Sequence, residues 1–286
     1  MALLRPLIDR WLRRRWRAGP GSGAFGGLRP ITVVTGASAG IGRALALEFA
    51  NLGNPVLLAA RTAGPLAEAA CALEVAGGKA FTVVADVSTP TGLAAIDEAL
   101  TSRGAYCDVL INNAAMGLSG PFSAHTEAEV ALLVDLNVRA LTVLMQRHLP
   151  GMLARGRGGI VNIASLGGYL PGPHQAAYYA SKAYVISLTE AVAAECRGMG
   201  VRICVVAPGP VATAFHRSMG AHTAYYAALS GWTSPAFVAS RAFRGFQWGR
   251  TVIVPGIVWR ALSHVVRVLP HPVLEPIVGW LLRRRQ

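Results

Sequence analysis

The amino-acid sequence predicts an α/β protein built on a doubly wound parallel sheet, as a single domain with helical N- and C-terminal extensions. Short runs of β-branched and other apolar residues alternate along the chain with stretches of helical periodicity. These runs have no polar face, which is typical of parallel strands covered by helices on both sides. A glycine-rich turn follows the first run directly, and such a turn can receive a ligand at the end of a strand.

Seven apolar runs are expected to form the strands, and the first is rich in β-branched residues and ends in glycine. In chain order they are ITVVTG (31–36), PVLLAA (55–60), AFTVVAD (80–86), DVLINNAA (108–115), GIVNIAS (159–165), VRICVVAPG (201–209) and TVIVPG (251–256). The helical stretches between them lie near residues 43–50, 63–76, 90–102, 127–149 and 176–198. This strict alternation indicates a parallel sheet rather than an antiparallel one.

Composition excludes several classes of protein. Of the 286 residues 53% are hydrophobic, which allows a sizeable core and excludes disorder over most of the chain. The net charge of +13 lies in the ends, because residues 1–30 hold seven arginines and one acidic residue, and residues 241–286 hold eight and one. Residues 31–240 hold twelve basic and twelve acidic residues. We therefore expect a charge-balanced domain with basic extensions and no nucleic-acid partner.

The cysteines and lysines are few. Four cysteines occur, at Cys71, Cys107, Cys196 and Cys204. None belongs to a C-x-x-C pair or has a histidine at metal-ligand spacing, so we expect buried thiols, no metal ion and a cytoplasmic protein. Only Lys79 and Lys182 are lysines among 27 basic residues, so a lysine within a motif is informative.

A basic amphipathic extension is expected over residues 1–30, before a main domain over residues 31–256. Residues 3–16 (LLRPLIDRWLRRRW) place apolar residues at helical spacing with arginines between them, and a glycine-rich linker follows over residues 19–27. Three interpretations stay open: contact with an anionic membrane surface, docking on the protein or a partner subunit, and a targeting sequence.

The tail, residues 257–286, is amphipathic and basic as well. Val258, Leu262, Val265 and Leu269 recur at helical spacing. Charged residues and a histidine prevent any run of 18 apolar residues, so we expect no membrane-spanning helix. The tail helices are expected either to cover a hydrophobic pocket or to touch lipid.

The sequence TGASAGIG (35–42) lies between the first strand and the first helix. Gly36 permits a tight turn, while Gly40 and Gly42 let the backbone approach a pyrophosphate and let the helix pack on the strand. Unpaired N–H groups of the helix N-terminus would face that anion. This context predicts a Rossmann-like dinucleotide site with contacts from Gly36, Ser38, Ala39, Gly40, Ile41 and Gly42.

The end of the second strand indicates which dinucleotide binds. A site for NAD(H) usually offers an acidic residue there, whereas a nearby arginine accommodates the 2′-phosphate of NADP(H). The sequence has Ala60 followed by Arg61, and residues 59–63 contain no acidic residue. We expect NADP(H) to be preferred over NAD(H); the alternative is that Arg61 is an ordinary solvated loop residue.

Three polar side chains are expected to converge beside the nicotinamide. The sequence YYASK places Tyr178 and Lys182 four residues apart on one helix face, and Ser165 ends the strand 159–165. A neighbouring ammonium and a positively charged cofactor ring would lower the pKa of the tyrosine below its usual value of about 10. The phenol could then exchange a proton with a substrate alcohol or carbonyl.

Together these motifs resemble the short-chain dehydrogenase/reductase family over about residues 31–255. Asp86-Val87 resembles its adenine-contacting pair, and NNAA (112–115) resembles its NNAG motif with alanine in place of glycine. PGPVAT (208–213) resembles the segment that borders the nicotinamide. The resemblance adds to the cofactor site Asp86, Val87, Asn113, Ala114, Ala115, Pro208, Gly209, Val211 and Thr213, together with Tyr178 and Lys182.

The resemblance also implies a role for each catalytic residue. Tyr178 would donate or accept the proton, Lys182 would lower the tyrosine pKa and hold the nicotinamide ribose, and Ser165 would hydrogen-bond the substrate oxygen. Asn137 in DLNVRA matches a fourth catalytic position that keeps a helix open for a water relay; simple helix capping is the alternative. Tyr179 is an alternative phenol, but the thirteen-residue spacing from Ser165 favours Tyr178.

We therefore expect an NADP(H)-dependent oxidoreductase that transfers a hydride between the nicotinamide and the carbonyl or secondary alcohol of a hydrophobic substrate. The aromatic-rich segment 211–250 would cover the substrate, and residues 168–171 would form the opposite wall. The alternative is a nucleotide-binding regulatory or interaction protein without turnover. The resemblance implies a homodimer or homotetramer, and the basic ends leave contact with the inner face of a membrane open. Three histidines in predicted loops are expected to be solvated or structural, namely His174, His216 and His222.

Overall fold

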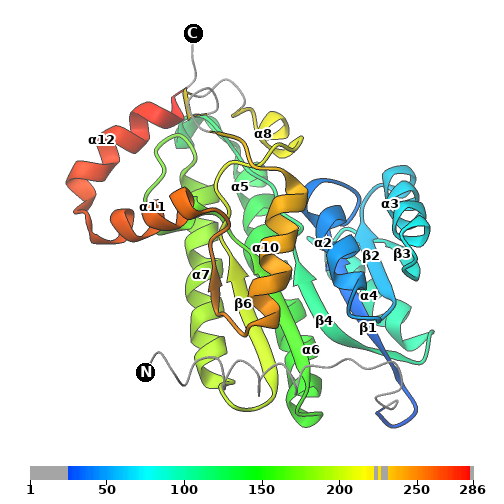
Figure 1. Ribbon diagram of the computed structural model, residues 1–286. Coiled ribbons are helices and arrows are strands. Elements are labelled where there is room, and N and C mark those ends of the chain that lie inside the picture. Colours follow the sequence, from blue (N-terminus) through cyan, green and yellow to red (C-terminus); the bar gives the residue numbers. More distant parts are fainter. Residues whose placement is uncertain (1–24, 222–224, 227–230, 284–286) are drawn as a thin grey trace.

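The computed structural model describes residues 25–221, 225, 226 and 231–283, so the helix expected over residues 3–16 lies outside the described part. Within that part, seven parallel strands form one sheet in the order β3-β2-β1-β4-β5-β6-β7 (Figure 1). The strands are β1 (Arg29–Thr35), β2 (Val56–Ala60), β3 (Ala80–Val84), β4 (Ala105–Asn112), β5 (Gly158–Ile163), β6 (Val201–Val206) and β7 (Val252–Ile253). The predicted doubly wound parallel sheet is confirmed, and its strand order reverses between β1 and β4.

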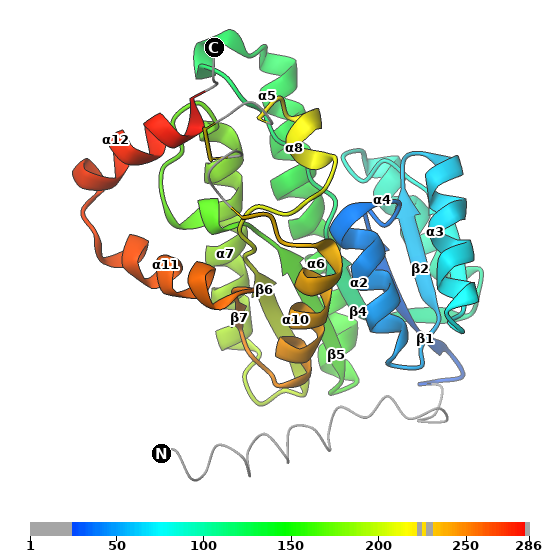
Figure 2. The ribbon, with the colours of Figure 1, turned by 45° about the horizontal axis from the view of Figure 1, so that its top comes forward.

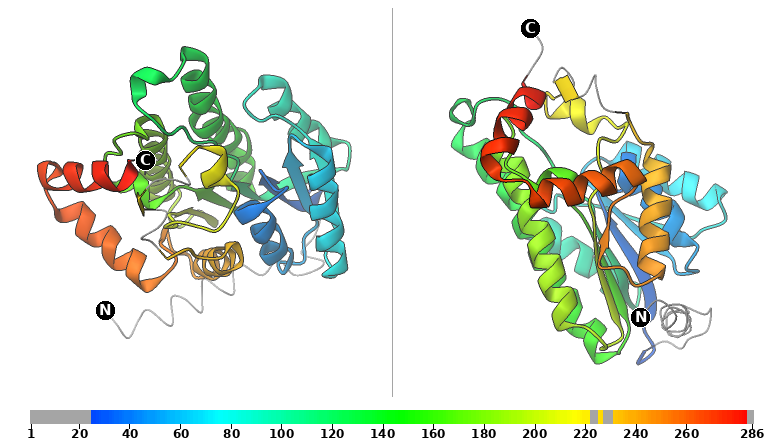
Figure 3. Two further views of the ribbon diagram at one scale, coloured as in Figure 1. Left: turned by 90° about the horizontal axis from the view of Figure 1, so that it is seen from above. Right: turned by 60° about the vertical axis from the view of Figure 1, so that its left-hand side comes forward.

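Helices form a layer on each face of the sheet, as Figure 3 shows from above. One layer consists of α2 (Gly40–Ala50), α3 (Ala63–Val75) and α10 (Pro235–Gln247). The other consists of α4 (Pro90–Thr101), α6 (Leu141–Ala154) and α7 (Ala176–Glu195). In the first layer the Phe49 ring packs 5.1 Å from that of Phe243, which therefore belongs to the core and not to the substrate cover. Three cysteines are buried as predicted, but Cys71 is exposed because it lies on the outer side of α3.

Every strand except β2 ends one to three residues before the predicted run does, and two of these ends have a clear local cause. β5 ends at Ile163, and Ser165 instead caps the 3-10 helix η3 (Leu166–Tyr169), where its hydroxyl accepts a hydrogen bond from the Gly167 N–H at 3.1 Å. β7 has only two residues, because Pro255 follows closely and has no N–H to extend the ladder.

The helix expected near 127–149 consists of three parts. It begins with α5 (Glu127–Val134), whose Thr126 and Glu129 form a reciprocal capping box. It continues through a π-helical turn, η2 (Asp135–Ala140), into α6. The turn widens the helix at the position of Asn137.

The tail forms two helices, α11 (Ile257–Val268) and α12 (His271–Leu282), at the edge of the molecule next to η3 and α7 (Figures 1 and 2). The short helix α8 (Phe215–Ser218) lies near the carboxyl ends of the strands, and η1 (Phe122–Ala124) precedes α5. Every helix in the described part of the chain is too short or too polar to cross a bilayer.

Candidate active site

The glycine-rich turn between β1 and α2 depends on the absence of side chains. Gly36 and Gly40 have φ angles of 63° and 55°, which glycine adopts without strain. A Cβ on Gly42 would lie 2.2 Å from the Gly36 carbonyl oxygen. The N-cap of α2 is Ala39, whose methyl group cannot accept a hydrogen bond from the first helical turn. The N–H groups at this helix end are therefore available to an anion, and the turn fits a pyrophosphate.

The loop after β4 holds this turn in place. The Asn113 side-chain amide donates to the carbonyl oxygens of Thr35 and Gly36, both at 3.0 Å. The backbone N–H groups of Asn113 and Ala114 donate to the Thr35 hydroxyl at 3.0 and 3.1 Å. Ala115 lines the adjoining cavity without a positive φ, so alanine is accommodated there without backbone strain.

Ser165, Tyr178 and Lys182 line one cavity of about 750 Å³ together with the glycine-rich turn. Tyr178 and Lys182 lie one turn apart on α7, and the Lys182 Nζ is 5.7 Å from the centroid of the Tyr178 ring. The same Nζ donates to the Ile163 carbonyl oxygen at 2.9 Å, at the end of β5. The structure thus brings the three predicted catalytic residues together.

Burial dominates the electrostatics of these residues. Burial raises the pKa of Tyr178 above its usual value, although a hydrogen bond with Ser165 opposes the effect. Burial also lowers the pKa of Lys182 to about 8. The expectation that the ammonium lowers the Tyr178 pKa is therefore not met, because the ammonium is directed at the Ile163 carbonyl.

Asn137 lies in the π-helical turn η2 and is 2% exposed. Its amide group pairs with the Met116 backbone, accepting from the N–H at 2.9 Å and donating to the carbonyl at 2.8 Å. It also donates to the Ser181 hydroxyl at 3.1 Å, and Ser181 precedes Lys182. Asn137 does not cap a helix, and it does not line the cavity. It therefore positions α7 against the loop after β4.

Most of the predicted cofactor residues line the cavity. These are Gly36, Ala39, Gly40, Ile41, Asn113, Ala114, Ala115, Tyr178, Lys182, Pro208, Gly209, Val211 and Thr213. The others lie outside its lining: Ser38, Gly42, Arg61, Asp86 and Val87. Arg61 is exposed directly after β2. Burial raises the pKa of Asp86, but hydrogen bonds from Ser88 and the nearby charge of Arg61 lower it overall, so Arg61 and Asp86 are electrostatic neighbours.

The half of the cavity beyond the catalytic residues is mainly apolar. Phe215 and Met219 of the predicted substrate segment line it, as does Leu170, the residue that follows η3. The tail helices complete it with Trp259, Leu262, Val265, Val266, Leu269, Leu274, Ile277, Val278, Leu281 and Leu282. Of the two roles expected for the tail, covering a hydrophobic pocket is therefore observed. The other three residues of the predicted opposite wall, Gly168, Tyr169 and Pro171, do not line the cavity. Gly168 packs against Lys182, and the Tyr169 ring lies 4.1 Å from the Arg267 guanidinium.

A polar cluster in this apolar half was not predicted. His216 and Tyr226 line the cavity, and the His216 Nδ1 lies 2.8 Å from the Tyr226 hydroxyl. Burial lowers the pKa of His216 to about 4, so the imidazole is neutral at physiological pH. Gln175 joins them from the start of α7. The sequence signal that could have indicated this cluster is the position of His216 among the aromatic residues of the segment 211–250.

Of the other two histidines named from the sequence, His174 has a positive φ of 65°, and His222 lies outside the described residues.

Comparison with known proteins shows related chains. A family model described as short chain dehydrogenase matches residues 30–224. The ketoacyl reductase HetN of Nostoc sp. is 34% identical over 223 residues, which are 78% of this chain and 77% of that protein.

Two solved structures resemble the fold. A short-chain dehydrogenase from Sphingobium yanoikuyae in complex with NADPH has 31% identity and a TM-score of 0.73, covering 82% of this chain and 93% of that one. A short chain dehydrogenase/reductase from Burkholderia phymatum in complex with NAD has 27% identity and a TM-score of 0.75, covering 89% and 97%. The family match ends before α10, so the tail helices lie beyond it.

Proposed function

The chain belongs to the short-chain dehydrogenase family and is an oxidoreductase, and we propose that it reduces hydrophobic ketones with NADPH or oxidises the corresponding alcohols. One observation carries the proposal: Ser165, Tyr178 and Lys182 line the same cavity as the glycine-rich turn. The name of the Nostoc relative, a ketoacyl reductase, supports a ketone substrate. A regulatory protein without turnover is the less favoured function, because nothing would require it to keep a buried amine beside a buried phenol.

Residues on both sides of the β1–β4 junction would hold the cofactor. The N-terminus of α2 would bind the pyrophosphate, and Lys182 would bind the nicotinamide ribose. Arg61 would neutralise the 2′-phosphate, since it is exposed at the end of β2 and no acidic residue lies within residues 59–63. When bound, the cofactor supplies the hydride. NADPH in the Sphingobium relative supports this preference, while the Burkholderia relative holds NAD.

The catalytic residues would handle the proton and the substrate oxygen. The Ser165 hydroxyl would hydrogen-bond that oxygen and orient it toward the phenol of Tyr178. Because its pKa is raised, Tyr178 stays protonated at neutral pH and is suited to act as the acid in reduction. Lys182, with a pKa of about 8, remains largely charged at pH 7, so its ammonium would be able to donate to the hydroxyls of the nicotinamide ribose.

The substrate would be bulky and mainly apolar, such as a lipid-like or aromatic ketone. The tail helices, α8 and η3 supply aliphatic and aromatic side chains to the far half of the cavity. The cluster of His216, Tyr226 and Gln175 is the polar exception on this wall, and it would give one hydrogen-bonding position to an otherwise hydrophobic molecule.

We also propose that the protein works in the cytoplasm as a homodimer or homotetramer, with its basic ends in contact with the inner face of a membrane. Exposed apolar residues on α5 and α7, such as Leu132, Val134 and Tyr184, support assembly through these helices. The positive charge of the ends supports contact with anionic lipid.

NADPH consumption with a panel of hydrophobic ketones tests the proposed reaction. The wild type should turn over, and Tyr178→Phe should lower kcat by about 10²–10⁴-fold, because general acid catalysis contributes that much. Tyr184→Phe changes a more exposed tyrosine on the same helix, so it is the matched control and should stay within about twofold of the wild type.

Turnover unaffected by Tyr178→Phe would refute the mechanism. A larger loss with Tyr179→Phe would assign proton donation to the Tyr179 phenol. Equal rates with NADH would contradict the role of Arg61.

A further inference from the structure

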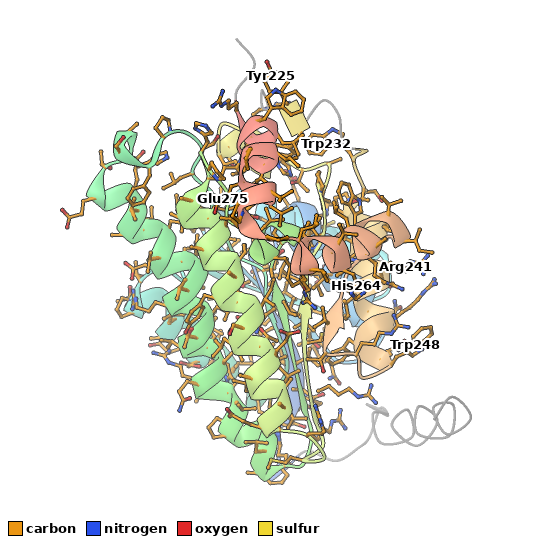
Figure 4. The ribbon with its side chains drawn as sticks, turned by 90° about the vertical axis from the view of Figure 1, so that its left-hand side faces the viewer. Tyr225, Trp232, Arg241, Trp248, His264 and Glu275 are labelled. Atoms are coloured by element: carbon orange, nitrogen blue, oxygen red, sulfur yellow. The ribbon has the colours of Figure 1, made fainter. Side chains whose placement is uncertain are left out.

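The tail helices have a second apolar face that points away from the cavity. On α11 the side chains of Ile257, Val258 and Val268 are 82%, 70% and 83% exposed. On α12 those of Val273 and Trp280 are about half exposed. Figures 2 and 4 show both helices at the edge of the described part of the molecule. One face of the Trp280 ring stacks on Tyr225, with the ring centroids 5.0 Å apart. We call these five residues the outer tail face.

Helical spacing separates most of this face from the cavity wall. On α11, Ile257 and Val268 fall on the side opposite the cavity residues Trp259 and Val266, whereas Val258 falls next to Val265 and Leu269 at the rim of the cavity. On α12, Leu274 and Val278 are buried, whereas Val273 and Trp280 are not. Both helices are therefore apolar on an inner and on an outer side, which covering a pocket does not require. Contiguous exposed apolar surface of this kind marks an interaction site.

The charge around the outer tail face indicates its occupant. Of the residues that the structure describes, 241–283 include six arginines and one acidic residue, Glu275. Two arginines lie against exposed aromatic rings of the α10 region: Arg241 is 5.2 Å from the Phe237 ring, and Arg250 is 5.0 Å from the Trp248 ring. Figure 4 shows Arg241 and Trp248 on the side of the molecule where α11 lies. A second copy would bring this positive charge against itself, whereas an anionic lipid surface complements it.

We propose that the outer tail face docks on the surface of a membrane that contains anionic lipids. The exposed aliphatic side chains would enter the boundary between headgroups and acyl chains, while the tryptophans and arginines would lie at the headgroup level. This is peripheral binding through helices that lie along the surface.

Docking would place the mouth of the cavity at the lipid. Leu262, Val265 and Leu269 of α11 line the cavity and are also partly exposed, so they form its rim beside the outer tail face. An apolar ketone dissolved in the membrane could then enter without crossing water. This route of entry rests on the proposed function, whereas docking itself requires no turnover.

Flotation of the full-length protein with vesicles tests the docking. One set contains equal parts of phosphatidylcholine and phosphatidylglycerol, and the other contains phosphatidylcholine alone. The double substitution Ile257→Asp, Val268→Asp puts two carboxylates on the outer tail face at positions that do not line the cavity. It should weaken binding to the anionic vesicles by about tenfold or more, through lost apolar burial and added repulsion. Val75→Asp is the matched control, since Val75 is 84% exposed but lies on α3 at the opposite end of the sheet (Figure 1).

The proposal is supported if the wild type and Val75→Asp float with the anionic vesicles and the double variant does not. Unaltered NADPH affinity of the double variant shows that it is folded.

Flotation unchanged by the double substitution would assign vesicle binding to another segment and overturn the proposal. A wild type that does not float would overturn it as well. Equal flotation with phosphatidylcholine alone would overturn the role of charge. A wild type that is dimeric and does not bind vesicles, together with a monomeric double variant, would show that the outer tail face binds a second copy of the chain. Because no substrate is present, these results do not depend on ketone reduction.

Discussion

At the scale of single residues, the buried charged groups show which positions serve stability and which serve chemistry. Asp108 is fully buried, but Arg157 donates to it at 2.9 and 3.1 Å and Asn54 at 2.9 Å, so its charge is compensated. Lys182 is only 4% exposed, yet among the residues that the structure describes its ammonium has one hydrogen-bond partner, the Ile163 carbonyl. A buried charge held so weakly costs stability, and this cost indicates that the site needs the amine.

We expect Lys182→Met to abolish turnover without loss of stability at pH 7. The pKa of the amine falls from 10.5 to about 8 on folding, so the charging penalty is fully present below pH 8 and disappears as the pH rises to about 10.5. Methionine removes this penalty, which offsets the roughly 1 kcal/mol lost with the hydrogen bond to Ile163. The wild type should therefore gain stability relative to the variant between pH 8 and 10.5.

Urea denaturation at pH 7 and pH 10 measures this effect. Lys79→Met is the control, because Lys79 is exposed and its substitution should leave the free energy of unfolding within about 0.5 kcal/mol at both pH values. A Lys182→Met variant several kcal/mol less stable than the wild type at pH 7, on the order of a lost buried ion pair, would show that the lysine is structural.

At the scale of elements, the cofactor half of the site depends on how closely α2 packs against β1. The Gly36 carbonyl lies where a side chain on Gly42 would be, and Asn113 clamps the same carbonyl from the loop after β4. The β1–α2 turn and the β4 loop therefore form one unit. A shift of α2 would displace the N–H groups that face the cofactor.

Gly42→Ala should destabilise the protein by about 1–3 kcal/mol, as expected for overpacking against backbone, and should weaken NADPH binding. Gly64→Ala in α3 is the control, because nothing lies within 4 Å of its added Cβ; it should leave NADPH binding unchanged and stabilise the helix by up to about 1 kcal/mol. Thermal denaturation and NADPH titration measure both quantities. Unchanged NADPH affinity in Gly42→Ala would show that the turn tolerates a shift of α2.

Elements carried by local patterns could be predicted from the sequence, and those set by distant contacts could not. The strands β1, β2 and β6 consist mainly of apolar and β-branched residues, so their positions were predicted within a few residues. Periodicity did not predict the π-helical turn, because Asn137 obtains its partners from Met116 and Ser181, which lie 21 and 44 residues away. The opening of the helix at Asn137 was expected only from the family resemblance. The end of β5 was placed at Ser165 because a polar residue after apolar ones does not show whether it extends a strand or caps the next helix.

At the scale of the whole molecule, the cavity has two halves of different origin. The cofactor half comes from strand ends along the sheet, and its residues follow motifs that the sequence shows directly. The substrate half combines η3 and α8 with the tail helices, which lie up to about one hundred residues further along the chain. The tail helices also lie beyond the family match. The sequence showed that the tail is amphipathic, but it did not show which surface the tail covers, because an apolar stripe can pack equally well against a pocket or against lipid. His216 was expected to be solvated or structural, and its place in the cavity could not be predicted because its contacts with Tyr226 and Trp232 form only in the folded chain.

This division predicts that substrate and cofactor binding can be changed separately. Leu274→Ser combined with Val278→Ser places two hydroxyls on the inner side of α12, where both side chains are buried and line the cavity. The KM for a bulky apolar ketone should rise by about tenfold or more, because each lost apolar contact in such a pocket changes discrimination by about 1–3 kcal/mol. A small ketone, which would remain near Tyr178, should be affected much less, and the Kd for NADPH should not change. Val273→Ser on the outer side of α12 is the control and should leave both constants unchanged. An equal rise in KM for both ketones, or a weaker Kd for NADPH, would mean that α12 supports the whole site and that the two halves are not independent.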